Sequence, residues 1–321
     1  MASRVLGEYG SYSEATRKKV LAAAKRLDYR PNTLARSLRL GRTKAIGVVV
    51  ANIASYHWTT FVMGIEEAAA SHGYQVILGT TADDPEAERR YVRTLFERNV
   101  DGIVLSPSTD NEEMLAEMAA GGFPMVLVES NSERVSAPRI NIDDRLAVAQ
   151  ATSHLLGLGH TRIGVVAGLQ TLASGRNRLL GYQDALAAAG IEQDAELVRY
   201  GDYQAEGGFT ATRELLSLSD RPTALVVCNE SMTGGAVRCL KELAVVVPDE
   251  LSLVAFDDPA WASFSTPALT TVRTPRVEVA RLALETLLRM IRNGSSDEAA
   301  PREMIVETEF IVRESSAPPP R

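Results

Sequence analysis

The feature that most constrains this fold is the regular alternation of short apolar segments with amphipathic helices from Ala45 onward. The apolar segments are nearly continuous, which is typical of parallel strands that are covered on both faces. Two such series follow one another, so we predict an α/β protein with two doubly wound lobes. The predicted strands are 45–50, 75–79, 102–105, 125–128 and 139–142, then 162–166, 197–200, 224–228, 253–256 and 270–272.

The helices between these strands are predicted from apolar periodicity. The last of them precedes a further apolar segment at 304–310, so we expect the chain to pass between the lobes again near that point. The Ser- and Pro-rich tail at 314–321 is expected to be disordered. The predicted helices are 59–72, 85–98, 111–120, 144–158, 177–189, 206–217, 231–244 and 276–292.

Charge is distributed unevenly along the chain. The net charge is −7, yet residues 1–44 carry eleven Lys and Arg against three Asp and Glu, whereas the remaining residues carry 23 against 38. A small basic segment on an acidic body is typical of a nucleic-acid-binding arm on a sensor domain. The alternative is an ordinary solvated basic helix or linker.

Two helices are predicted in this basic segment. Residues 13–28 form an amphipathic helix with an apolar stripe at helical spacing. Residues 31–40 form a shorter one, in which Pro31 suits the first turn and Asn32 can cap it. A helix this short is marginal alone in water, so we expect it to fold only against a partner.

Several classes of protein are disfavoured. No apolar segment approaches the roughly 20 residues of a membrane span, and the first residues lack the apolar core of a secretory signal. The two cysteines and four histidines show no metal-ligand spacing, and there is no nucleophile elbow or P-loop. We therefore expect a cytoplasmic protein with reduced thiols, without metal, cofactor or enzymatic activity.

Eight segments together carry a resemblance that no one of them establishes alone. In this order and spacing, the sequence resembles the lac-repressor (LacI/GalR) family of bacterial transcription regulators over nearly its full length. The segments are SRVLG at 3–7, YRPNTLARSL at 29–38, GRTKAIGVVV at 41–50, NVDGIVL at 99–105, LGHTRIG at 158–164, RNRLLGY at 176–182, FDD at 256–258 and TPALTTV at 266–272.

The resemblance implies a domain organisation. It places a partial all-α helix-turn-helix headpiece at 1–44, with a hinge helix at 31–40, before a periplasmic-binding-protein-like core. The first lobe would comprise 45–143 and 275–303, and the second 144–274 and 304–313. Such a protein is expected to be a homodimer that binds operator DNA and a small effector. Without DNA binding, it would be a stand-alone sugar-binding module.

The same resemblance implies which residues contact DNA. Leu38 would wedge into a minor-groove step from each of two paired hinge helices, although it could instead pack against its dimer mate. Of the recognition helix only the end, near Arg4, is matched, so we expect this chain to bind a specific operator weakly or not at all. The candidate DNA contacts are Arg4, Tyr29, Asn32, Ala35, Arg36, Ser37, Leu38 and Arg39.

Candidate effector contacts include residues that follow strands, because ligands of such folds bind beyond the carboxyl ends of parallel strands. His57 and Trp58 could stack on a ligand or pack between the lobes. Asp143 could contact the effector or cap the helix that follows it. Asn229 follows another predicted strand, and the longer Glu230 puts contacts at that edge in doubt.

The remaining candidates are an arginine, a serine and a carboxylate. Arg178 matches an effector-contacting arginine of the family, and its planar fork can hold two hydroxyls or an anion; the alternative is a surface ion pair. Ser174 lies one turn earlier. Asp257 can accept hydrogen bonds from two sugar hydroxyls, or serve as a cap or hinge contact. This chemistry favours a sugar and leaves a nucleoside or purine open.

Overall fold

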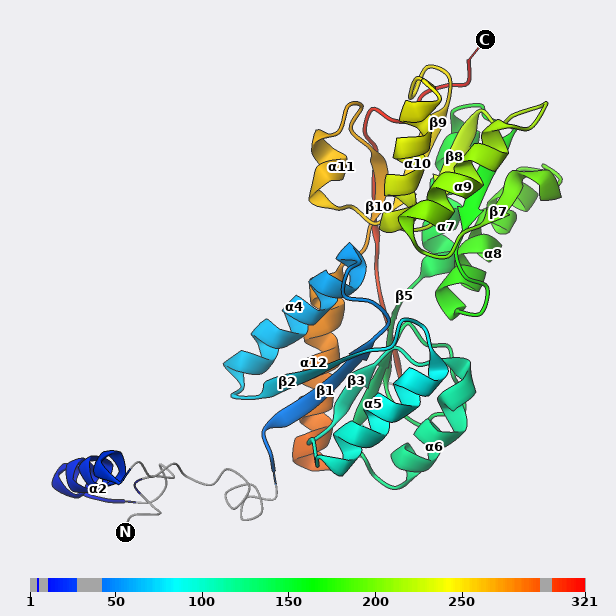
Figure 1. The fold of residues 1–321 in the computed structure, drawn as a ribbon. Coiled ribbons are helices and arrows are strands. Elements are labelled where there is room, and N and C mark those ends of the chain that lie inside the picture. The colour runs from blue at the N-terminus through cyan, green and yellow to red at the C-terminus, as the bar shows by residue number, and fades with distance from the viewer. Residues whose placement is uncertain (1–4, 6–10, 28–41, 295–301, 321) are drawn as a thin grey trace.

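The computed structural model describes residue 5 and residues 11–27, 42–294 and 302–320. Within that part, the body consists of two α/β lobes, each built on a six-stranded sheet (Figure 1). The predicted pair of doubly wound lobes is therefore confirmed. The first sheet has the order β11-β5-β4-β3-β1-β2, and the second has the order β12-β10-β9-β8-β6-β7.

Nearly all neighbouring strands within the described residues run parallel, but β12 runs antiparallel to β10. In the first sheet the strands are β1 (Ala45–Val50), β2 (Gln75–Thr80), β3 (Ile103–Leu105), β4 (Met125–Val128), β5 (Arg139–Ile142) and β11 (Glu303–Val306). In the second they are β6 (Ile163–Ala167), β7 (Val198–Tyr200), β8 (Ala224–Val227), β9 (Ser252–Phe256), β10 (Thr270–Arg273) and β12 (Glu309–Ile311).

The helices follow the strands in the alternating order that the sequence predicted. Those of the first lobe are α4 (Tyr56–Ser71), α5 (Pro85–Glu97), α6 (Glu112–Ala120) and α12 (Arg276–Asn293), with the short η1 (Thr109–Asn111). Those of the second lobe are α7 (Asp144–Gly157), α8 (Ala173–Ala188), α9 (Ala205–Leu216), α10 (Glu230–Glu242) and α11 (Ala260–Phe264), with η2 (Ala195–Leu197). The sequence did not predict α11, whose five residues are too few to show a helical period.

Successive side chains of a strand point to opposite faces of its sheet, so apolar strands require helices on both faces. In β1, Val48 and Val50 belong to the apolar cluster that contains Phe61 of α4, whereas Val49 belongs to the cluster that contains Val92 of α5. Helices α4 and α12 pack together on one face of the first sheet, and α5 lies on the other (Figure 1). The strands are apolar throughout because both faces are buried.

Within the described residues, the chain passes between the lobes at three places. These lie between β5 and α7, between β10 and α12, and between β11 and β12. The third passage comes later than the predicted position near 303, because β11 pairs in parallel with β5 of the first sheet. The expectation that all of 304–313 belongs to the second lobe is therefore wrong for residues 304–306, and the apolar segment at 304–310 is divided between two sheets.

The expected disorder of the tail at 314–321 is also wrong for residues 314–320. Ser315 is fully buried, its hydroxyl donates to the carbonyl of Leu253 at 2.6 Å, and it accepts from the backbone N–H of Thr270 at 2.8 Å. The ring of His160 lies 2.8 Å from the carbonyl oxygen of Ala317. The tail therefore completes the hydrogen bonding of the second lobe beside β9 and β10.

Part of the predicted headpiece lies outside the described residues, including the hinge helix at 31–40. Helix α2 (Glu14–Arg26) is present, and the hydroxyl of Ser13 caps it by accepting from the N–H of Thr16. It has no buried residue, and Leu27 at its end is 73% exposed. The apolar stripe of this helix is therefore only partly covered, with Val20, Ala23 and Ala24 half-buried.

Candidate functional site: a cavity between the lobes

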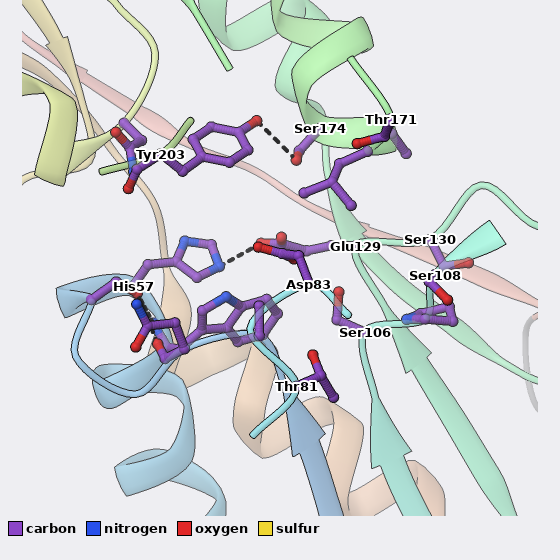
Figure 2. A pocket seen from close by; sticks show the side chains of 18 of the residues that line it. His57, Thr81, Asp83, Ser106, Ser108, Glu129, Ser130, Thr171, Ser174 and Tyr203 are labelled. Atoms are coloured by element: carbon purple, nitrogen blue, oxygen red, sulfur yellow. Dashed lines mark hydrogen bonds and ion pairs between the residues drawn. The ribbon is translucent and has the colours of Figure 1, made fainter. Parts of the chain in front are cut away.

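A cavity opens between the two lobes beyond the carboxyl ends of the strands. Residues of the first lobe reach it from the segments that follow β1, β2, β3 and β4, and residues of the second reach it from the segments that follow β6, β7, β8 and β9. Figure 2 shows side chains of both groups facing one another across it. Six of the seven predicted effector contacts line this cavity: His57, Trp58, Ser174, Arg178, Asn229 and Asp257.

Arg178, on α8, is the basic group most deeply placed in the cavity wall. Its side chain is almost fully buried; Nε donates to Asp144 at 2.7 Å and Nη1 donates to the carbonyl of Cys228 at 2.6 Å. Its guanidinium lies 3.8 Å from the ring centre of Phe256. The expected alternative, an ion pair, is thus present, but it is buried rather than on the surface. It fixes the plane of the guanidinium beside the cavity.

A second charged network joins the two lobes at the cavity. Nε2 of His57 lies 2.7 Å from Oε1 of Glu129, and the same oxygen accepts from Nη1 of Arg276 at 2.7 Å (Figure 2 shows the first contact). Arg276 also donates through Nε to the hydroxyl of Thr274, which in turn donates to Asp257 at 2.7 Å. His57, Glu129 and Arg276 belong to the first lobe and Asp257 to the second, so this network crosses the lobe boundary.

The network determines the charge of its carboxylates. Burial alone raises the pKa of Glu129, but the contacts with His57 and Arg276 outweigh it and hold the pKa well below its usual range. The pKa of Asp257 is lowered in the same way, because Arg276, His57 and Arg178 outweigh its burial. Both carboxylates are therefore ionised at neutral pH, and Arg276 holds them in the cavity wall.

Polar groups on the second lobe complete the wall. The hydroxyl of Tyr203 lies 3.2 Å from that of Ser174, and burial raises the pKa of Tyr203, so it stays protonated as a hydrogen-bonding group. The side chain of Asn229 donates to the carbonyl of Tyr203 at 3.3 Å and accepts from the N–H of Met232, which caps α10. Asn229 is thus held in place by its own helix while it lines the cavity.

Trp58 supplies the apolar part of the first lobe's wall. It is 8% exposed and meets the ring of His57 edge to face, with ring centres 4.6 Å apart, and Phe61 likewise at 5.7 Å. These two neighbours belong to the first lobe, so they do not show the expected alternative of packing between the lobes; the residue also lines the cavity, where a ligand could contact it.

Four of the lining residues have an unusual backbone conformation. Asp83, Glu129, Tyr203 and Asp257 have φ angles of 60°, 53°, 62° and 71°, in the left-handed region that residues other than glycine rarely adopt. Each follows a strand closely. Backbone strain of this kind concentrates at ligand-binding sites, where the surrounding structure holds it in place.

Asp143 is the predicted contact that does not line the cavity. Its side chain is exposed and accepts from the N–H of Leu146 at 2.8 Å, so it caps α7, as its alternative role required. The next residue, Asp144, lies in the first turn of α7 and is turned inward onto Arg178. Of the two adjacent carboxylates, Asp143 thus caps α7 and Asp144 forms the buried ion pair.

Glu230 and Trp261 also lie off the cavity, where Trp261 Nε1 donates to Glu230 at 3.3 Å.

Several residues that line the cavity were not predicted from the sequence. Thr81, Asp83, Ser106, Glu129 and Tyr203 all come shortly after strands, so the rule that found Asp257 could also have found them. Arg276 had no such signal, because it begins a helix and reaches the network from behind the cavity wall. The candidate DNA contacts, Arg4, Tyr29, Asn32, Ala35, Arg36, Ser37, Leu38 and Arg39, lie outside the described residues.

Comparison with known proteins establishes the family. Residues 152–316 match the model of a periplasmic binding protein-like domain. The chain is 30% identical over 314 residues to the HTH-type transcriptional repressor PurR of Photobacterium profundum, and the match covers 98% of this chain and 93% of that protein. This chain belongs to the lac-repressor (LacI/GalR) family.

Solved structures of the family agree with this assignment. A lac repressor dimer bound to operator and the anti-inducer ONPF superposes with a TM-score of 0.87 at 27% identity, covering 98% of this chain and 94% of that one. A complex of the transcriptional regulator CelR with cellobiose gives a TM-score of 0.77 at 31% identity, with the same coverage of each chain. The chain is therefore a DNA-binding transcriptional regulator with an effector site between its lobes, and a stand-alone binding module is not favoured.

Two further observations concern other classes of function. Among the described residues, no helix is both long enough and apolar enough to cross a membrane. The same part of the chain contains no group of three or more His, Cys, Asp or Glu side chains placed to hold a metal ion.

Proposed function

We propose that the effector of this regulator is a sugar, and that the residues lining the cavity between the lobes bind it. The observation that carries the proposal is the oxygen-rich lining of the cavity, in which hydroxyl and carboxylate groups stand near an arginine and a tryptophan. Sugar hydroxyls both donate and accept, so they match such a mixed set of groups. The hydroxyl-bearing residues of the lining include Thr81, Ser106, Ser108, Ser130, Ser132, Thr171, Ser174 and Tyr203.

The roles of individual residues follow from their contacts. The guanidinium of Arg178 is oriented by Asp144 and can donate to adjacent hydroxyls of a ring. Asp257 can accept from hydroxyls through its second carboxylate oxygen, since the first is bonded to Thr274. Trp58 offers an apolar surface for the C–H groups of a sugar.

Effector binding would act on DNA through the relative position of the lobes. The sugar would contact both lobes, so it stabilises one degree of closure over others. A change in closure moves the first lobe, from which the chain leads back toward the basic segment at 1–44. Coupling between two such sites is typically about 1–3 kcal/mol. The sugar strengthens operator binding if it favours the degree of lobe closure that the DNA-bound form has. It weakens operator binding if it favours a different degree of closure.

The working form would be a cytoplasmic homodimer that catalyses no reaction. Two copies would present paired DNA-binding segments to the two halves of an operator, as a two-fold symmetric regulator requires. The lac repressor in the matching structure is likewise a dimer on operator DNA. Sedimentation of the purified chain would test this state.

A thermal-shift screen with common mono- and disaccharides and with nucleosides tests the effector class. A sugar present at 100 times its dissociation constant should add about 2.7 kcal/mol of stability and raise the melting temperature. The same sugar should change the affinity for operator DNA, which we expect the partial recognition helix to weaken, and fluorescence anisotropy measures both effects. Stabilisation by nucleosides but by no sugar would refute the proposal.

A further inference from the structure

The sign of the charge in the cavity points to a property of the effector that the family does not determine. Among the described residues, five acidic side chains line the cavity: Asp83, Glu88, Glu112, Glu129 and Asp257. The basic residues of the lining are Arg176, Arg178 and, when protonated, His57. Acidic side chains therefore outnumber basic ones in the lining. Their effect on a ligand depends on which of these side chains are already paired within the protein.

The basic groups are already engaged with the protein. Arg178 is paired with the buried Asp144 at 2.7 Å. Arg176 donates through Nη1 to the carbonyls of Gln170 at 2.8 Å and Thr171 at 2.9 Å. Arg276, behind the wall, is shared between Glu129 at 2.7 Å and Asp257 at 3.6 Å. The charges of Arg178 and Arg276 are thus offset by carboxylates, whereas the exposed Arg176 keeps its positive charge, because carbonyl groups do not neutralise it.

Two carboxylates of the lining, in contrast, can accept further hydrogen bonds. Asp257 is 1% exposed, and its Oδ2 has no hydrogen-bond partner within the described chain although it is buried at the cavity. The side chain of Asp83 makes no hydrogen bond within the described residues, and its pKa is raised by burial and then by the nearby charge of Glu129. Figure 2 shows Asp83 and Glu129 together on the first-lobe side of the cavity.

A helix N-terminus contributes positive charge to the cavity wall. The first turn of α8, from Ala173, lines the cavity, and no side chain caps its N-terminal N–H groups. A helix N-terminus contributes about half a positive charge. Arg276 offsets only part of the charge of Glu129 and Asp257, and the five acidic side chains of the lining outnumber its basic ones, so the balance across the cavity stays negative.

We propose that this cavity selects effectors without negative charge and rejects phosphorylated or acidic ones. The inference rests on the proposed binding of a sugar in the same cavity, and it narrows that class to sugars that are neutral or carry an amine. The unpaired acceptor Oδ2 of Asp257 is suited to a hydroxyl or an ammonium group and would repel an anion held close to it. Asp83 is the group that sets the discrimination most directly, because no partner in the described part of the chain offsets its charge.

Matched pairs of ligands test the proposal on the full chain. The pairs are glucose and glucose 6-phosphate, galactose and galactose 6-phosphate, fructose and fructose 6-phosphate, and adenosine and adenosine 5′-monophosphate. Dissociation constants are measured by isothermal titration calorimetry at fixed ionic strength. For the pair whose neutral member binds, the phosphorylated member should bind at least about tenfold more weakly, which corresponds to about 1.4 kcal/mol.

Charge-neutralising variants assign the effect to a residue. Asp83→Asn keeps the shape of the side chain, and asparagine tolerates the positive φ of this position. It should reduce the preference for the neutral member of the pair. Asp143→Asn removes the same charge from an exposed cap outside the cavity, where asparagine caps equally well, and should leave the preference unchanged.

The possible outcomes separate this inference from the sugar proposal. A phosphorylated sugar that binds as tightly as its parent, or more tightly, overturns the charge inference and leaves the sugar function standing. An unchanged preference in Asp83→Asn overturns the role of that residue. If adenosine alone binds and its monophosphate does not, the charge inference holds and the sugar proposal fails. If no member of any pair binds at millimolar concentration, the charge inference fails, and the wider screen of mono- and disaccharides decides the sugar proposal.

Discussion

The carboxylate of Asp257 is bonded directly to the segment that connects the lobes: its Oδ1 accepts from the hydroxyl of Thr274 at 2.7 Å. Asp257 follows β9 and lines the cavity, whereas Thr274 lies between β10 of the second lobe and α12 of the first. Both side chains are buried. A ligand that contacts Asp257 therefore acts one hydrogen bond away from a point at which the lobes are joined.

Replacing Thr274 by valine should destabilise the protein and weaken its response to effector. The variant keeps the side-chain shape but removes the donor to Asp257 and the acceptor for Nε of Arg276. Leaving such buried groups without partners costs about 1–3 kcal/mol. Urea unfolding gives the stability, and operator anisotropy with and without effector gives the response. Thr274→Ser keeps the hydroxyl and serves as control; equal losses in the two variants would contradict this role.

Replacing Arg178 by methionine should cost more stability than removing both members of its ion pair. The single variant leaves Asp144 buried without its cation, which costs about 3–5 kcal/mol. Arg178→Met combined with Asp144→Asn removes that isolated charge, so the double variant should be more stable than Arg178→Met alone. Neither variant should retain effector binding. A double-mutant cycle in urea measures this, and simple additivity would argue against the pair.

The Glu129 network should make stability depend on acidic pH in a specific direction. The folded-state pKa of Glu129 lies below its ordinary value of 4.5, so its contribution is fully present above pH 4.5 and is lost as the pH falls further toward the folded-state value. Glu129→Gln should therefore be less stable than the wild type at neutral pH, and the difference should shrink as the pH falls below 4.5. The free energy of unfolding, followed from about pH 7 to about pH 3, tests this. A constant difference would refute it.

The tail should contribute measurably to the stability of the second lobe. Ser315→Ala removes a fully buried hydroxyl that bonds to both β9 and β10, and we expect a loss of about 1–3 kcal/mol. Glu314→Ala, at the exposed neighbouring position, should change stability little. Thermal unfolding of the two variants distinguishes an anchored tail from the disordered one that its composition suggested.

The strands and longer helices were predictable because both lobes bury their sheets on two faces, which leaves a clear pattern of apolar runs and periodic helices. Positions at strand ends were predictable for the same reason, and Asp257 is an example. The choice between Asp143 and Asp144 was not, since it depends on which of two adjacent carboxylates caps α7 and which turns inward. Arg276 could not be found either, because its role depends on the approach of α12 to Glu129 from a distant part of the chain.

The late passage of the chain between the lobes has a consequence during synthesis. Strand β11 forms an edge of the first sheet, and α12 covers one of its faces, yet both come after the whole of the second lobe's segment from α7 to β10. When residues 45–142 leave the ribosome, they still lack these pieces of their own domain. The first lobe can therefore be finished only after translation has passed residue 306, and shortened proteins that end before α12 should expose its unfinished core to chaperones.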